Sequence, residues 1–330
     1  MGMTGKERVI RALKFENPDR VPVDLWTLPA AYLEHGAKLD ELIKRRCIDI
    51  LRAPYNDPTF DERHNQIGGY TDVWGSGWKN AQAGIIGEVK TYPLDDYAKL
   101  AGYRSPVGLL KGGFEETDAF IQAHSDRFIL GGWINLFERM QFLRGTENLY
   151  MDIAEECDEL LELREIVMDF YREYLRQWLE HPVDGICFGD DWGSQRSLLI
   201  SPASWRKLFK PCYQELFDMV HASGKYVFFH SDGYIFDLYP EFIEMGVDAI
   251  NSQLWCMGVE KVAASYAGKI CFWGEISRQD TLPFGTPDDI RRCADTMKKY
   301  LYVNGGGLIG QSEVSRDTPL PNIEAVLNCW

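Results

Sequence analysis

The sequence predicts an α/β fold in which eight parallel strands close into a (β/α)8 TIM barrel. Eight short apolar runs alternate with longer helical stretches, and no linker rich in serine, glycine or proline divides the 330 residues. Continuous apolar runs are typical of parallel strands buried on both faces, and closure of the sheet removes its two exposed edges. We therefore expect a single domain over residues 1–330. The predicted strands are residues 21–26, 47–54, 128–134, 185–192, 225–232, 247–253, 269–276 and 306–313.

Helix signals occur between these strands. Thr4 and Glu7 form a capping-box pattern that predicts a helix running to about Phe15. Ser201 and Thr286 each stand before a proline, the pattern of an N-cap followed by proline at the first helical position. Each of these predicted helices lies outside the predicted strands in the sequence, as expected for a chain in which strands and helices alternate.

One region departs from this alternation. Residues 57–94 combine glycines, aromatic residues and short apolar–polar alternations, which predict an antiparallel hairpin. Because the region follows the second predicted strand, we interpret it as an insertion that folds over the mouth of the barrel. An ordinary surface hairpin is the alternative.

The composition restricts the possible partners and location. Hydrophobic residues make up 45% and charged residues 26%, as in globular proteins, and 35 basic against 50 acidic residues give a net charge of −15. An acidic chain repels nucleic acids and anionic membranes, and no apolar run approaches the ~20 residues of a membrane span. The eight cysteines form no C-x-x-C pair and predict reduced, mostly buried thiols. We expect a cytoplasmic protein with neither a nucleic-acid nor a membrane partner.

Polar and aromatic side chains follow most of the predicted strands. The active site of a barrel of this type lies at the carboxyl ends of its strands. The residues at those ends are Asp24, Trp26, Trp133, Asn135, Asp190, Asp191, Trp192, His230, Asp232, Asn251, Gln253, Glu275, Gln311, Ser312 and Glu313. They predict a mouth rich in carboxylates and indole rings, with a single histidine.

A metal site is predicted on the fifth strand. His230 and Asp232 are two positions apart, so in an extended chain they point to the same side. Such a pair can hold a metal ion or act as an acid–base dyad, and Glu275 could supply a third metal ligand across the mouth. Hydrogen bonds from both residues to loop backbone are the alternative.

Other residues of the mouth are candidates for catalysis and substrate binding. Asp24 and Asp191 are the candidate catalytic acids, although Asp24 could be a core residue, and one of the adjacent Asp190 and Asp191 could cap a helix. Tryptophans at a barrel mouth favour a flat apolar slot for a planar ligand, whereas rings that merely plug the barrel are the alternative. The predicted substrate-binding residues are Trp26, Trp133, Asp190, Trp192, Asn251, Gln311 and Ser312.

Three segments, residues 6–23, 189–233 and 310–326, resemble the uroporphyrinogen decarboxylase superfamily. This resemblance covers nearly the whole chain and implies a (β/α)8 barrel. In the decarboxylases of this superfamily, an arginine-containing motif near the N-terminus binds substrate carboxylates. The matching residues 25–35 contain no arginine here, which argues against a tetrapyrrole with eight carboxylates as substrate.

The chain resembles more closely the corrinoid-dependent methyltransferases of that superfamily, such as methylcobalamin:coenzyme M methyltransferases. These bind zinc through a His-x-Cys pair and a cysteine on the last strand, where this sequence has His230, Asp232 and Ser312. A site of histidine and carboxylates is harder than a thiolate site and suits an oxygen-bearing methyl donor better than a thiol. The resemblance therefore implies zinc, a methoxylated and possibly aromatic small-molecule donor, and a corrinoid protein as partner. A decarboxylase acting on another carboxylate and a non-catalytic binding protein are the alternatives.

Overall fold

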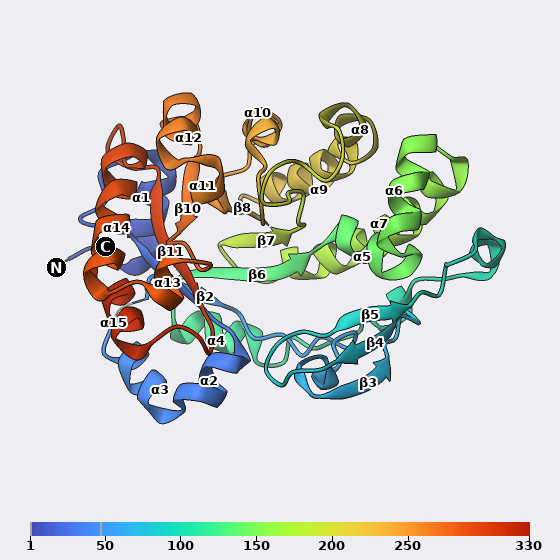
Figure 1. Ribbon diagram of the computed structural model, residues 1–330, viewed down its shortest axis with the longest axis horizontal. Coiled ribbons are helices and arrows are strands. Elements are labelled where there is room, and N and C mark those ends of the chain that lie inside the picture. The colour runs from blue at the N-terminus through green and yellow to red at the C-terminus, as the bar shows by residue number, and fades with distance from the viewer. Residues whose placement is uncertain (1, 47) are drawn as a thin grey trace.

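A computed structural model describes residues 2–46 and 48–330 and confirms the barrel (Figure 1). Eight parallel strands lie in the order β1-β11-β10-β9-β8-β7-β6-β2. Asp49 N–H donates to the carbonyl of Val23 at 2.8 Å, which joins the two end strands of the sheet and nearly closes it. The strands are β1 (Val23–Thr27), β2 (Ile50–Arg52), β6 (Phe128–Ile134), β7 (Gly185–Gly189), β8 (Tyr226–Ser231), β9 (Ala249–Ser252), β10 (Cys271–Glu275) and β11 (Leu308–Val314). Six of the eight fall within the predicted runs, whereas β1 and β11 each extend one residue beyond theirs, to Thr27 and Val314. Cys47, at the start of the second run, lies outside the described residues.

Helices surround the barrel. The α-helices are α1 (Gly5–Lys14), α2 (Pro29–His35), α3 (Ala37–Lys44), α4 (Thr117–Ala123), α5 (Leu136–Arg144), α6 (Thr146–Glu155), α7 (Asp158–Leu179), α8 (Pro202–Leu208), α9 (Lys210–Ala222), α10 (Tyr239–Glu244), α11 (Leu254–Met257), α12 (Val259–Tyr266), α13 (Thr281–Phe284), α14 (Pro287–Leu301) and α15 (Leu320–Asn328). Short 3-10 helices cover η1 (Glu62–Asn65), η2 (Tyr97–Gly102), η3 (Pro106–Leu109) and η4 (Phe236–Leu238). The predicted N-caps Thr4, Ser201 and Thr286 are confirmed, because each side chain accepts a hydrogen bond from a backbone N–H of its helix.

The interior of the barrel is layered. Apolar side chains from the first halves of the strands pack together with Val9, Ala12 and Leu13 of α1. Side chains alternate along a strand, so residues two positions beyond this apolar layer also point inward. Polar and charged residues occupy those next positions: Arg52, His230, Asn251, Glu275 and Gln311. The strand register thus places a ring of polar groups above an apolar plug.

The segment predicted as a hairpin forms a three-stranded antiparallel sheet. Its strands are β3 (Gly68–Thr71), β4 (Gly77–Asn80) and β5 (Glu88–Thr91), so it has one strand more than a hairpin. Figure 1 shows this sheet to one side of the barrel, near α5 and α6. The Ser76 hydroxyl donates to the carbonyl of Phe142 at 2.8 Å, and Leu94 N–H donates to that of Leu143 at 3.0 Å. The insertion is therefore tied to α5.

Two further sequence expectations concern cysteines and membranes. The seven cysteines within the described residues are free thiols, three of them buried, and Cys47 falls outside the described residues. Among residues 2–46 and 48–330, no helix combines the length and the apolar character that a membrane crossing requires.

Asp190 fixes α5 to the end of β7. Its carboxylate is fully buried and accepts hydrogen bonds from the N–H groups of Phe137 at 2.9 Å and Glu138 at 2.8 Å and from the Tyr213 hydroxyl at 2.5 Å. These N–H groups belong to the first turn of α5, where backbone donors lack partners within the helix. Burial raises the pKa of Asp190 to about 7.

This pKa predicts a pH dependence of stability. Between about pH 4 and pH 7 the unfolded chain has lost the Asp190 proton while the folded chain retains it, so stability falls as pH rises and levels off above about pH 7. The slope is up to ~1.4 kcal/mol per pH unit. In Asp190→Asn the contribution of this group should disappear, so the total slope should become shallower than in the unaltered chain, although the variant should be less stable throughout because its amide cannot accept all three hydrogen bonds. Urea unfolding at pH 5, 6, 7 and 8 measures both slopes, and an unchanged slope in the variant would contradict the assignment.

Candidate functional site

A histidine and two aspartates meet at the carboxyl ends of β7 and β8. The Nε2 atom of His230 lies 3.6 Å from Oδ1 of Asp191 and 3.5 Å from Oδ1 of Asp232. One potential ligand atom from each residue lies within 4.8 Å of the others. The Asp232 N–H donates to Oδ1 of Asp191 at 2.8 Å and fixes the two aspartates relative to each other. We refer to Asp191, His230 and Asp232 as the His–Asp cluster.

Asn251 determines which nitrogen of His230 faces this cluster. The Asn251 amide nitrogen donates to the carbonyl of Trp273 at 2.6 Å, which leaves its oxygen directed at Nδ1 of His230, also at 2.6 Å. Nδ1 must therefore carry a proton to donate. In the neutral ring Nε2 then has a free lone pair directed toward Asp191 and Asp232, the state in which histidine binds a metal ion.

Glu275, the predicted third ligand, is not brought into the His–Asp cluster. It is 3% exposed, and burial raises its pKa to about 8. Its Oε2 lies 3.5 Å from Nε of Arg278, and the same guanidinium bonds to Glu313 at 2.6 Å and also to Asp232. Arg278 thus partly neutralises three carboxylates, including one of the cluster. The third potential ligand is instead Asp191, which the sequence analysis marked as a candidate catalytic acid.

A cavity of about 750 Å³ opens beside His230, and we call it the tryptophan cavity. The ring centroids of Trp26 and His230 are 5.2 Å apart, and those of Trp133 and His230 are 5.9 Å apart. Trp133 lies over Gly189, where a Cβ atom would come within 2.1 Å of the indole. A glycine at this position is therefore needed to admit the ring. Trp26 and Trp133 both line the tryptophan cavity.

Asp24 holds two indoles in this cavity. Its Oδ2 accepts hydrogen bonds from Nε1 of Trp26 at 3.0 Å and from Nε1 of Trp273 at 2.8 Å. Burial raises the pKa of Asp24, whereas the positive charge of Arg52 acts in the opposite direction. Because an indole N–H can only donate, Asp24 fixes the orientation of both rings.

Three other predicted substrate-binding residues, Asp190, Trp192 and Ser312, lie outside the mouth of the barrel. Asp190 caps α5, and Trp192 is fully buried and stacks on Phe137 with centroids 4.1 Å apart. Ser312 is fully buried, its hydroxyl donates to the carbonyl of Gln311, and strand alternation turns it to the face opposite Gln311. None of these three side chains reaches the mouth.

Gln311 and Asn251 do point into the barrel. Asn251 donates to Oε1 of Gln311 at 2.9 Å, so the pair extends the hydrogen bonding behind His230. Nε2 of Gln311 is buried and has no hydrogen-bond partner among the described residues. Both residues support the site from behind.

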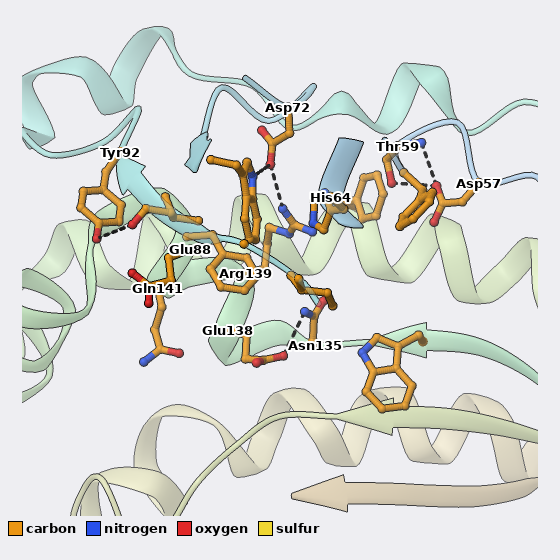
Figure 2. A pocket seen from close by; sticks show the side chains of 18 of the residues that line it. Asp57, Thr59, His64, Asp72, Glu88, Tyr92, Asn135, Glu138, Arg139 and Gln141 are labelled. Carbon is orange, nitrogen blue, oxygen red and sulfur yellow. Dashed lines mark hydrogen bonds and ion pairs between the residues drawn. The ribbon is translucent and has the colours of Figure 1, made fainter. Parts of the chain in front are cut away.

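A second cavity of about 800 Å³ lies between the insertion and α5, and we call it the insertion cavity (Figure 2). Asp72 of the insertion lies 3.6 Å from Arg139, and on the other wall Asn135 donates to Glu138 at 3.1 Å. Burial and the nearby Asp191 raise the pKa of Glu138 well above its usual value. Both cavities are lined by Asp57, Phe60, Trp133 and Tyr174.

Sequence reasoning missed several residues of the site. Arg52 is the last residue of β2, and Trp273 alternates with Glu275 on β10, so both stood at positions that strand alternation marks as inward. Arg278 lies in the loop between β10 and α13, where strand alternation assigns no direction to its side chain. Glu138 lies within a helix, and nothing in its local pattern distinguishes it from a surface residue.

Comparisons with known proteins agree with this architecture. The family model for uroporphyrinogen decarboxylase (URO-D) matches residues 130–330. A methyltransferase from Methanosarcina mazei superposes with a TM-score of 0.72 at 21% identity, covering 99% of this chain and 98% of that chain, which establishes a shared fold. None of the curated proteins matches the chain.

Two other solved structures are more distant. A 3-keto-D-glucoside 4-epimerase from E. coli has a TM-score of 0.41 at 14% identity over 73% of this chain and 95% of that chain. An intracellular xylanase from Thermoanaerobacterium saccharolyticum has a TM-score of 0.42 at 10% identity over 90% of this chain and 86% of that chain. Both TM-scores lie below 0.5, which is too low to indicate a shared function.

Because the family match spans more than half of the sequence, the chain belongs to the uroporphyrinogen decarboxylase family.

Proposed function

We propose that this chain is a zinc-dependent methyltransferase that transfers a methyl group from a small methoxylated substrate to a corrinoid carried by a partner protein. The observation that carries the proposal is the free Nε2 of His230, directed at Asp191 and Asp232 next to the tryptophan cavity. We further propose that the reaction takes place in the cytoplasm.

The His–Asp cluster supports the metal part of the proposal. Its donors are one imidazole nitrogen and two carboxylates, a set that zinc accepts, and three protein ligands leave a coordination position open for substrate. Zinc bound there would act as a Lewis acid toward an ether oxygen. Arg278 bonds to the same Oδ1 of Asp232 that faces His230, so it lowers the negative charge that Asp232 presents to an ion.

The tryptophan cavity supports the substrate part. Trp26 and Trp133 line the cavity beside His230 and pack edge to face, with ring centroids 6.0 Å apart. Aromatic walls with few polar groups favour a planar, largely apolar ligand. Asp24 is a positioning residue in this scheme, since it holds Trp26 rather than the reacting atoms. We propose that the insertion, residues 57–94, shields this mouth from water through its first residues, of which Asp57 and Phe60 line the cavity.

Similarity and charge favour methyl transfer over the alternatives. The solved structure that superposes with a TM-score of 0.72 is described as a methyltransferase, which supports the same activity here. Decarboxylation of a tetrapyrrole with eight carboxylates needs several cationic partners, but Arg52 is the single arginine or lysine among the described residues that line the tryptophan cavity. A decarboxylase acting on a smaller carboxylate is the second candidate, and Arg52 is the observation in its favour.

Metal binding tests the first part of this proposal. Purified chain supplied with zinc should retain about one ion after gel filtration, because three ligands are already assembled. His230→Ala should lose the ion, and Asn251→Ala should weaken binding by about 10–100-fold through loss of the support behind the ligand. His124→Ala, which removes the C-cap histidine that follows α4 outside the site, is the control. Binding that is as tight in His230→Ala as in the unaltered chain would show that the ion sits elsewhere.

Methyl transfer tests the second part. Zinc-loaded chain, a reduced corrinoid and a panel of methoxybenzoates should yield a methylated corrinoid and the corresponding phenol. Activity should fall at least about tenfold in His230→Ala, a change equivalent to ~1.4 kcal/mol of transition-state stabilisation. Absence of transfer from every ether or alcohol tested would reject the assignment, and release of CO2 from the same substrates would favour the decarboxylase instead.

A further inference from the structure

Arg52 occupies an unusual position in the tryptophan cavity. It ends β2, its side chain remains accessible to solvent, and its guanidinium carbon lies 5.2 Å from the ring centroid of Trp26 and 5.5 Å from that of Trp133. The guanidinium is therefore held between the two indoles that also flank His230. Such contacts fix the plane of the group and leave its N–H donors at the edges.

The charge of Arg52 lacks a carboxylate partner at contact distance. Within residues 2–46 and 48–330, no acidic oxygen lies within 4.0 Å of it, and its one hydrogen bond is a 3.6 Å contact to Sγ of Cys187. Asp24 acts on it only through space, since Oδ2 of Asp24 is engaged by two indole N–H groups. Arg278 contrasts with Arg52, because it is surrounded by three carboxylates.

We propose that Arg52 binds a carboxylate of the substrate, so that the ligand of the tryptophan cavity is an aromatic carboxylate whose ring lies against Trp26 and Trp133. An arginine fork matches a carboxylate with two parallel hydrogen bonds. An anion bound there lies next to the two indoles that flank His230, in a chain of net charge −15 that otherwise repels anions. An aromatic carboxylate would be the substrate of the methyl transfer proposed above, so this assignment of the substrate class rests on that proposed function.

Ligand binding to metal-free protein tests this without requiring turnover. Tryptophan fluorescence and calorimetry would compare 4-methoxybenzoate with 4-methoxybenzamide, which has nearly the same shape but no charge. The unaltered chain should bind the benzoate at least about tenfold more tightly, which corresponds to ~1.4 kcal/mol, within the range for a hydrogen bond to a charged group. Equal affinities, or no binding of either compound at millimolar concentration, would overturn the inference.

Variants identify the residue responsible. Arg52→Gln should abolish the preference for benzoate, and Arg52→Lys should retain part of it because a point charge replaces the fork. Arg196→Gln, which removes an exposed arginine that lines neither cavity, should leave the preference unchanged. A preference that persists in Arg52→Gln would also overturn the inference. If the benzoate binds through Arg52 but no methyl transfer occurs, the proposed function fails while the carboxylate site stands.

Discussion

The hydrogen bond between Asn251 and His230 determines what the mouth of this barrel can do. At 2.6 Å it places the proton of the neutral imidazole on Nδ1, and the amide that accepts it is itself fixed by its bonds to Trp273 and Gln311. Without this chain of donors and acceptors the ring could turn or exchange its proton position. Nε2 would then no longer present a lone pair to Asp191 and Asp232.

The closed parallel sheet makes that hydrogen bond possible. His230 and Asn251 are paired across β8 and β9, so their side chains leave the sheet at the same height and on the same side. The same register sets Gln311 opposite Glu275 and Asp24 on neighbouring strands. Acidic side chains are thus concentrated at one level of the barrel. The positive charge of Arg278 is paired with the carboxylates around Glu275, whereas the positive charge of Arg52 has no carboxylate at contact distance among the described residues and can pair with an anionic ligand.

The sequence was sufficient for the barrel because its signals are local. Apolar runs, capping boxes and N-cap residues before proline each specify an element from neighbouring residues, as at Thr4 and Thr286. It was also sufficient for His230 and Asp232, whose spacing places them on one side of a strand. The insertion was recognised as antiparallel, but its third strand was not distinguished.

The sequence could not settle which groups pair across the mouth. It indicated that one of the adjacent Asp190 and Asp191 could cap a helix, but not that the first caps α5 while the second joins His230. Glu275 stands at a strand end, yet its engagement by Arg278 depends on the loop that follows β10. For Ser312 the alternation with Gln311 was sufficient to predict an outward orientation, and alignment to a cysteine of related proteins outweighed that signal.

X-ray absorption at the zinc edge tests the central claim most directly. If His230, Asp191 and Asp232 hold the ion, the spectrum of the zinc-loaded chain should contain only nitrogen and oxygen ligands at about 2.0–2.2 Å, with a histidine contribution that is absent in His230→Ala. A sulfur shell near ~2.3 Å would mean that cysteines bind the metal, and a spectrum unchanged in His230→Ala would place it outside the His–Asp cluster. Either result would contradict the account.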